Sequence, residues 1–310
     1  MVVAGVTALE RVLWGLGKAG VLTAVVAGEA FPLRGDLPIL VAWVPEGTPP
    51  ADDALVVRGD VVAGVTVADA ASRRAAEKEL LRGLGKSFQG ITDALVNHHF
   101  SRPITDVLSH TRVTPNQVTA VSIALGLVGA ALLLDRSYLC VALGGVAIEV
   151  QSILDSCDGE LARLRFQYSR FGQWLDNIGD DVVDNAFLAC AGLAAGGVWA
   201  WIGGAAALAR LTVAAGMFIE VYRATGTGDV YQFRMWFERD KKTADERFDP
   251  RSPMTWLRNV GRRDTYTFGW MLLCLLGLLP GVVVWGAAIG LVSAVTMAIH
   301  MFKRLRGDLG

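Results

Sequence analysis

The chain has 310 residues, of which 53% are hydrophobic and 19% charged, and its mean hydropathy is +0.41. This composition excludes an ordinary soluble protein and favours an integral membrane protein. The net charge of −1 excludes a broad basic surface, so no nucleic-acid partner is expected. The four cysteines lack the paired spacing of zinc sites, and the sequence predicts neither a zinc cluster nor a disulfide framework.

Residues 1–80 predict a small α/β domain. The runs 37–44 and 54–57 are short and apolar between turn clusters, which is typical of buried strands, and 2–26 indicates a helix followed by a strand. Charged residues precede any long apolar run, without the order of a cleavable signal peptide. We therefore expect this domain to stay in the cytoplasm.

Residues 81–113 predict a juxtamembrane amphipathic helix. Leu95, Phe100 and Val107 are interspersed with charged residues, as in helices that lie along a membrane surface. Pro103 is expected to kink or divide this helix.

Residues 114–303 predict an all-α membrane domain with six transmembrane helices. Each apolar run is close to the 20 residues that a bilayer core requires. The runs are 115–134, 138–158, 173–196, 199–222, 264–280 and 281–302. Thr114 followed by Pro115 is a strong start signal for the first helix.

The distribution of basic residues predicts the orientation. Lysines and arginines gather in the connections 159–171 and 223–263 and after residue 302, whereas the opposite side carries Arg136. Positive residues favour the cytoplasmic side. We therefore expect both termini and the Asp-rich connection to face the cytoplasm, in an inner (cytoplasmic) membrane.

Four carboxylates stand out at the second and third predicted spans. Asp155 and Asp158 are three residues apart, and Asp176 and Asp180 four apart, so each pair projects from one helix face. Antiparallel helices joined by a 13-residue turn, 159–171, would bring the two faces together. Four partly buried negative charges require protonation or cations, and oxygen-only ligands favour two Mg²⁺ or Mn²⁺ ions over zinc.

Small residues and one arginine accompany the carboxylates. Gly159, Ala162 and Gly172 leave room for a bulky phosphate or nucleotide close to the backbone. Arg163 supplies a guanidinium for phosphate oxygens. The stretch therefore predicts a metal-dependent nucleotide site.

The stretch from Asp155 to Asp180 resembles the signature of the CDP-alcohol phosphotransferase family, Asp-x2-Asp-Gly-x2-Ala-Arg-x8-Gly-x3-Asp-x3-Asp, at each defined position. The resemblance implies a six-helix membrane enzyme that displaces CMP from a CDP-linked donor by an alcohol. It implies metal ligation by Asp155, Asp158, Asp176 and Asp180, with Asp180 also accepting the proton of the attacking hydroxyl. It further implies CDP contacts from Gly159, Ala162, Arg163 and Gly172.

The resemblance extends beyond this stretch. Residues 114–119 are similar to the opening of the family's first membrane helix, which implies that Asn116 and Thr119 reach the cytidine. Residues 100–105 and 262–264 look most like members related to archaeal di-inositol-phosphate phosphate synthases. Residues 9–20 and 55–60 resemble pieces of a nucleotidyltransferase without its Gly-rich loop, so we interpret residues 1–80 as a remnant without its own catalysis. A homodimer is usual in the family.

Three arginines are candidates for binding a phosphorylated acceptor. Arg210 lies in the middle of a predicted span, where a charge is costly unless it faces a polar cavity, and Arg262 and Arg263 flank the fifth span. For Arg262 and Arg263, topology and headgroup contact are the alternative. The acceptor alcohol stays open, and the donor is either CDP-diacylglycerol or a soluble CDP-alcohol.

Two other functions compete with this hypothesis. Asp180, Asp181 and Asp184 form the DDxxD pattern of a Mg²⁺-dependent membrane prenyltransferase, although that pattern leaves Gly159 and Arg163 unexplained. The other alternative is a membrane anchor or pseudoenzyme whose soluble domain binds partners, which the intact carboxylates disfavour.

Overall fold

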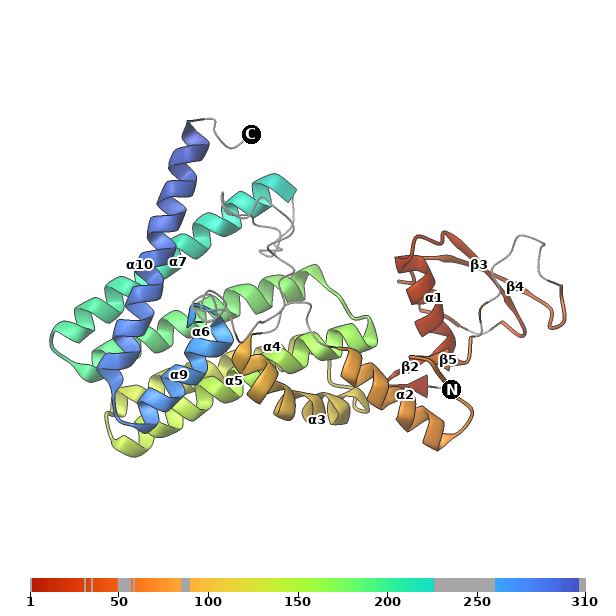
Figure 1. Cartoon of the computed structure of the whole chain (residues 1–310), viewed down its shortest axis with the longest axis horizontal. Coiled ribbons are helices and arrows are strands. Elements are labelled where there is room, and N and C mark those ends of the chain that lie inside the picture. Colours follow the sequence, from red (N-terminus) through yellow and green to blue (C-terminus); the bar gives the residue numbers. More distant parts are fainter. Residues whose placement is uncertain are drawn as a thin grey trace, which may run out of the picture. The chain divides into compact units, whose positions relative to one another are not determined.

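The computed structural model describes residues 2–84, with gaps at 31, 35, 50–56 and 58, together with residues 90–225 and 260–306. The chain forms two compact units (Figure 1). The first comprises residues 1–84 with 109–111, and the second comprises residues 85–108 with 112–310.

The first unit contains both helices and strands. α1 (Ala8–Lys18) begins with a capping box between Thr7 and Glu10, and α2 (Ala70–Gly83) begins with one between Asp69 and Ser72. β3 (Thr23–Ala27) pairs in parallel with β4 (Leu40–Val44), which lies inside the predicted strand 37–44. The predicted strand 54–57 lies outside the described residues apart from its last position. That this unit is a cytoplasmic domain stays a prediction.

A hexapeptide, Val-Val-Ala-Gly-Val-Thr, occurs twice in the first unit, at 2–7 and 61–66. Each copy forms an antiparallel hairpin, β1 (Val2–Val3) with β2 (Val6–Thr7) and β5 (Val61–Val62) with β6 (Val65–Thr66). The Ala-Gly loop of each has two positive φ angles, as a tight hairpin loop requires. Val3 and Val62 pack in one apolar cluster, so the two hairpins share a core.

The second unit is helical. A π-helical turn, η1 (Asp93–Asn97), leads into α3 (His98–Ser109), which continues through Pro103 without the predicted division. The remaining helices are α4 (Pro115–Leu132) with the 3₁₀ turn η2 (Leu133–Asp135), α5 (Tyr138–Arg165), α6 (Arg170–Ala195), α7 (Val198–Thr225), α9 (Arg263–Leu275) and α10 (Leu279–Leu305). As predicted, Thr114 caps α4 with Pro115 in its first turn.

The predicted 13-residue turn between the second and third spans is wrong. α5 continues to Arg165 and ends at Phe166, which has a left-handed backbone (φ 55°), and α6 begins directly after Ser169. The charges of 159–165 suggested a loop, but Glu160 and Arg165 are buried and hydrogen-bonded. The Arg165 guanidinium, for example, donates to the carbonyl oxygens of Val113 at 2.6 Å and Leu108 at 2.7 Å. The motif from Asp155 to Arg163 is therefore helical throughout.

Within the described part of the chain, four helices are long and apolar enough to cross a membrane, namely Pro115–Asp135, Tyr138–Arg165, Val198–Arg223 and Leu279–Leu305. α6 carries Asp180, Asp181 and Asp184 near its middle, and α9 has 13 residues. α6 is therefore more charged, and α9 shorter, than an ordinary membrane-spanning helix. The chain is a helical membrane protein, and the count of six spans stays a prediction.

Small residues allow α4 to pack closely against both α5 and α6. A Cβ atom at Gly144 of α5 would lie 2.7 Å from the carbonyl oxygen of Gly129 on α4, and one at Gly179 of α6 would lie 2.1 Å from Ile123 Cδ1. Such close approach is typical of helix packing in membranes. α4 therefore fixes the depth at which α5 and α6 present their acidic residues.

The core of this unit joins α6 with α9 and α10. The rings of Phe187 and Trp270 stack with centroids 5.7 Å apart, and both side chains are fully buried. Leu188 of α6 contacts the backbone position of Gly286 on α10. This packing holds the start of α9 near the acidic half of α6.

Candidate active site

Three carboxylates from two helices come together where α5 and α6 face each other. Asp155 and Asp158 lie on α5 and Asp176 on α6, and one oxygen of each lies within 4.8 Å of the others. Asp176 Oδ1 is buried and has no hydrogen-bond partner among the described residues. A buried, unpartnered carboxylate oxygen within an all-oxygen donor set fits a hard divalent cation. We call Asp155, Asp158 and Asp176 the carboxylate triad.

Asp158 is oriented by α4. Its Oδ2 accepts a hydrogen bond from Thr119 Oγ1, which also lies 3.1 Å from the carbonyl oxygen of Pro115. Thr119 has one hydroxyl proton, and a carboxylate is the stronger acceptor. In this structure the Thr119 hydroxyl therefore donates to Asp158 of the carboxylate triad. Its contact with cytidine stays a prediction.

Asn116 and Gly172 lie against each other beside the carboxylate triad. A Cβ atom at Gly172 would lie 2.5 Å from Asn116 Oδ1 and 2.8 Å from Ser169 Oγ, closer than real Cβ contacts. Ser169 Oγ in turn accepts a hydrogen bond from the Gly172 amide at 2.8 Å. The glycine thus permits the side chain of the first turn of α4 to meet the first turn of α6.

Gly159, Ala162 and Arg163 follow Asp158 on the same stretch of α5. A Cβ atom at Gly159 would lie 3.3 Å from Arg163 Nη1, so the absence of a side chain gives the guanidinium its place. Arg163 Nε is buried and has no acceptor among the residues described. A buried guanidinium donor of this kind is suited to an anionic ligand. The predicted roles of these residues in binding CDP stay predictions.

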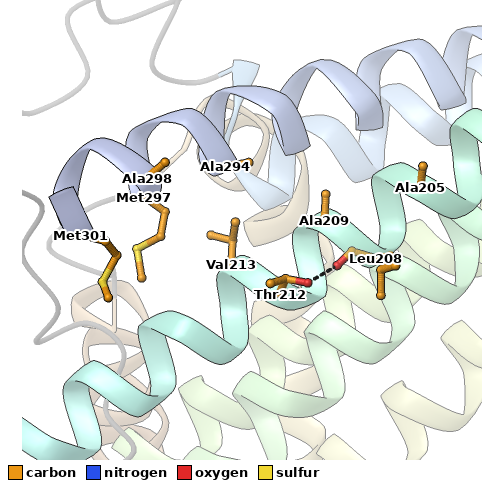
Figure 2. Close-up of a pocket in the computed structure, with 9 residues that line it drawn as sticks. All are labelled: Ala205, Leu208, Ala209, Thr212, Val213, Ala294, Met297, Ala298 and Met301. Carbon is orange, nitrogen blue, oxygen red and sulfur yellow. Dashed lines mark hydrogen bonds between the residues drawn. The ribbon is translucent and has the colours of Figure 1, made fainter.

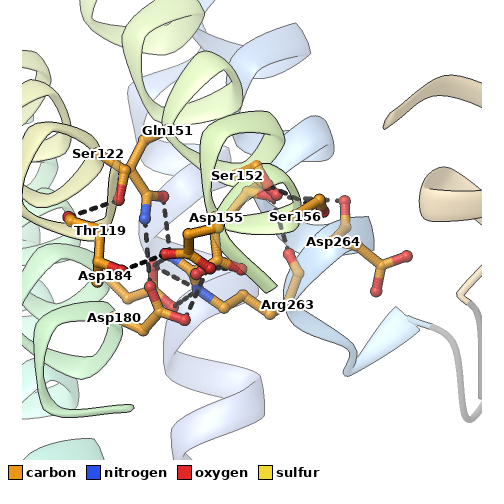
Figure 3. A network of polar contacts seen from close by, with 12 residues as sticks. Thr119, Ser122, Gln151, Ser152, Asp155, Ser156, Asp180, Asp184, Arg263 and Asp264 are labelled. Carbon is orange, nitrogen blue, oxygen red and sulfur yellow. Dashed lines mark hydrogen bonds and ion pairs between the residues drawn. The ribbon is translucent and has the colours of Figure 1, made fainter. Parts of the chain in front are cut away.

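Asp180, the fourth carboxylate of the motif, does not join the carboxylate triad but contacts α9 (Figure 3). Arg263 Nη1 lies 2.9 Å from Asp180 Oδ2 and 3.4 Å from Asp155 Oδ2. Gln151 Nε2 donates to Asp180 Oδ1 at 3.2 Å, and its Oε1 accepts from Arg263 Nη2 at 2.8 Å. Both oxygens of Asp180 are thus engaged by protein donors.

Asp184, one helical turn beyond Asp180, lies close to the guanidinium groups of both Arg263 and Arg210. It is 2% exposed and accepts from Arg263 Nε at 3.2 Å. Its Oδ2 also accepts from the Tyr266 hydroxyl and lies 3.7 Å from Arg210 Nη2. Arg210 lies over the Tyr266 ring, with its Cζ 4.9 Å from the centroid. A charge in the middle of α7 is thereby compensated.

The three predicted acceptor-binding arginines therefore separate into two groups. Arg210 and Arg263 meet on Asp184, whereas Arg262 Nε pairs with Asp264 Oδ1 at 3.1 Å and is not part of that contact. Their role in binding an acceptor phosphate stays a prediction.

Sequence reasoning missed Gln151 and Tyr266 and did not assign Asp184 to a site of this kind. A signal existed for two of them, because Gln151 precedes Asp155 by four residues and Asp184 follows Asp180 by four. Residues four apart share a helix face. Tyr266 carries no such signal, since its place depends on the packing of α9.

An apolar hollow lies between α7 and α10 (Figure 2). It has a volume of about 500 Å³, and its lining is apolar apart from Thr212, whose hydroxyl donates to the Leu208 carbonyl oxygen at 2.8 Å. It offers no charged group to a phosphate.

Residues 112–299 match the family model for CDP-alcohol phosphatidyltransferases. This region contains the carboxylate triad together with Asp180 and Asp184. The chain belongs to the CDP-alcohol phosphatidyltransferase family. Because Asp184 is paired with two arginines and family membership is established, phosphotransfer is favoured over the DDxxD prenyltransferase alternative.

Curated relatives of this CDP-alcohol phosphatidyltransferase family member are named bifunctional IPC transferase and DIPP synthase. The Aquifex aeolicus protein is 35% identical over 105 residues, covering 33% of this chain and 24% of the relative. The Thermococcus kodakarensis protein is 38% identical over 104 residues, covering 33% and 23%. The Rubrobacter xylanophilus protein is 35% identical over 123 residues, covering 40% and 28%. The chain thus matches about a quarter of the length of these relatives, whose name agrees with the predicted similarity to di-inositol-phosphate phosphate synthases.

Proposed function

We propose that the chain is a metal-dependent CDP-alcohol phosphotransferase, which transfers a substituted phosphate group from a CDP-linked donor to an alcohol and releases CMP. The observation that carries the proposal is the carboxylate triad of Asp155, Asp158 and Asp176. The glycines at 159 and 172 and the unpartnered Arg163 Nε lie on the same two helices. Together they offer a cation site and, on the same two helices, a donor for phosphate.

The carboxylate triad is proposed to hold the first of two ions, Mg²⁺ or Mn²⁺, and Asp180 to contribute to the second. When bound, the ions supply charge neutralisation for the pyrophosphate and for the departing CMP. Thr119 donates a hydrogen bond to Asp158 and so holds it beside Asp155 and Asp176. Arg163, with the space at Gly159, Ala162 and Gly172, is proposed to bind the CDP moiety, and Asn116 to contact its cytidine.

Asp180 is proposed to act as the general base. The acceptor hydroxyl oxygen bonds to the phosphorus atom that carries the donor's alcohol, while the bond from that phosphorus to the oxygen bridging to CMP breaks. The hydroxyl proton passes to the Asp180 carboxylate, and CMP departs with the bridging oxygen. Arg210, Arg262 and Arg263 are proposed to meet a phosphorylated acceptor.

The remaining proposals concern context. We place the enzyme in the cytoplasmic membrane with its site and both termini facing the cytoplasm, because basic residues gather on that side. The donor is a CDP-diacylglycerol or a soluble CDP-alcohol, in phospholipid or phosphodiester synthesis. A homodimer follows the family pattern, and residues 1–80 are proposed to be a nucleotidyltransferase remnant.

The test is release of CMP by the purified full-length protein, in detergent or vesicles, from a panel of CDP-linked donors and alcohols, with Mg²⁺, Mn²⁺ or EDTA. We expect CMP in equal amount to the phosphodiester, only with metal, and none from Asp158→Asn. Asp135→Asn is a matched control at an exposed carboxylate outside the motif and should behave as wild type. Pyrophosphate release from a prenyl donor would overturn the proposal, as would metal binding by folded protein without turnover of any CDP donor.

A further inference from the structure

The Arg263 side chain places a positive charge beside the motif carboxylate Asp180. Arg263 is the first residue of α9, yet its Nη1 lies 2.9 Å from Asp180 and 3.4 Å from Asp155 on two other helices. The side chain is about one fifth exposed, as are both carboxylates. At these distances and this burial, a guanidinium–carboxylate attraction is only partly screened by solvent.

Asp180 is fully engaged in this arrangement. Its Oδ2 faces Arg263, its Oδ1 accepts from Gln151, and it is absent from the carboxylate triad. Four neighbouring carboxylates would repel one another without a compensating charge. Arg263 supplies one positive charge, and it does so at the carboxylate that the triad leaves out.

Asp184 gives Arg263 a second anchor that is independent of the motif. Arg263 Nε lies 3.2 Å from Asp184 Oδ2, and Asp184 is itself fixed by Tyr266 and Arg210. The planar guanidinium presents different donors to the two carboxylates. Arg263 can therefore leave Asp180 and still keep a charged partner.

We propose that Arg263 is a resident counter-cation, which neutralises Asp180 and Asp155 when they hold no ion and must withdraw toward Asp184 before Asp180 binds one. The proposal rests on the proposed function, since it presumes ions on these carboxylates. Its consequence is that a first ion on the carboxylate triad meets Arg263 only at Asp155, 3.4 Å away, whereas a second ion on Asp180 competes directly with Arg263 at 2.9 Å.

The test is titration of purified protein with Mn²⁺ alone, without a donor, with bound ions counted by electron paramagnetic resonance. Wild type is expected to bind one ion tightly and a second weakly. In Arg263→Gln the second ion should bind at least about tenfold more tightly, because a positive charge beside a divalent cation has been removed. Arg262→Gln is the matched control, because the neighbouring Arg262 pairs with Asp264, and it should leave both affinities unchanged.

Two further variants keep the test decisive. Asp158→Asn should lose the first ion, which shows that this ion occupies the carboxylate triad. Arg263→Lys keeps the charge but cannot hold Asp180 and Asp184 with separate donors, so the affinity for the second ion should rise by a smaller factor. This variant replaces Arg263→Gln if Arg263→Gln does not fold.

Unchanged affinity for the second ion in Arg263→Gln or Arg263→Lys, with the first ion still bound, would overturn the counter-cation proposal and leave the proposed function standing. Absence of any ion from folded wild type would overturn both. Equal tightening in Arg262→Gln would also count against the proposal, because the effect would then be general electrostatics.

Discussion

Substitution of Gly172 by alanine tests the donor site in a way that separates function from stability. The new Cβ atom would lie 2.5 Å from Asn116 Oδ1 and 2.8 Å from Ser169 Oγ. Contacts this short force the Asn116 side chain to withdraw from the start of α6. Because Gly172 is proposed to leave room for the CDP moiety, the methyl group also reduces the space for the donor.

The expected change in stability is small. Alanine is favoured over glycine inside a helix by about 1 kcal/mol. Displacement of Ser169, which caps α6 through the Gly172 amide, costs about 1 kcal/mol in the opposite direction. By contrast, a displacement of about 1 Å among positioning groups can reduce the rate about 100-fold. We therefore expect kcat/KM for the CDP-linked donor to fall by roughly 10- to 100-fold with little change in Tm.

The assay compares CMP release kinetics and thermal unfolding in detergent for wild type and Gly172→Ala. Gly204→Ala is the matched control, because it lies in a helix of the same unit and its Cβ atom would meet nothing within 4 Å. That variant should keep wild-type kinetics. Wild-type kcat/KM in Gly172→Ala, or an equal loss in both variants, would refute the reasoning.

Four further outcomes are expected. Asp180→Asn should abolish turnover but leave CDP binding by isothermal titration largely intact, and near-normal turnover would refute its assignment as the base. Glu160→Ala should destabilise α3 by about 1–3 kcal/mol, because it removes the acceptor of buried hydroxyls, and faster hydrogen exchange there would show this. Trp270→Ala should cost about 3–5 kcal/mol of unfolding free energy in denaturant titration; a loss below 1 kcal/mol would contradict the packing described. Arg11→Met removes the donors to the Val3 carbonyl oxygen and should speed hydrogen exchange in the first hairpin of the full chain, unlike Lys18→Met.

Local sequence signals predicted the start of one membrane helix and the shared helix face of two carboxylates. Thr114 and Pro115 marked the start of α4, and the spacing of Asp155 and Asp158 placed both on one face. These features depend on a few neighbouring residues, so they can be read without knowledge of the fold. The stretch from Asp155 to Asp180 also indicated the family, which the match over residues 112–299 confirms.

Contacts between distant segments were not predictable in the same way. The charges after Asp158 suggested a loop, because Glu160 and Arg165 are buried by hydrogen-bond partners that lie more than 50 residues away in sequence. Likewise, the capture of Asp180 by Arg263 joins residues that only the packing of α9 brings together. The sequence therefore predicted which side chains carry charge, but not how the charges are paired.

The most direct test of the central claim is to measure CMP release and Mn²⁺ occupancy of the carboxylate triad on the same samples as Mn²⁺ is added. We predict that no CMP forms while the triad is empty, that release requires its occupancy, and that Asp158→Asn shows neither at matched concentrations. Metal-independent release of CMP by metal-free wild type, or undiminished release by Asp158→Asn with the triad empty, would contradict the account.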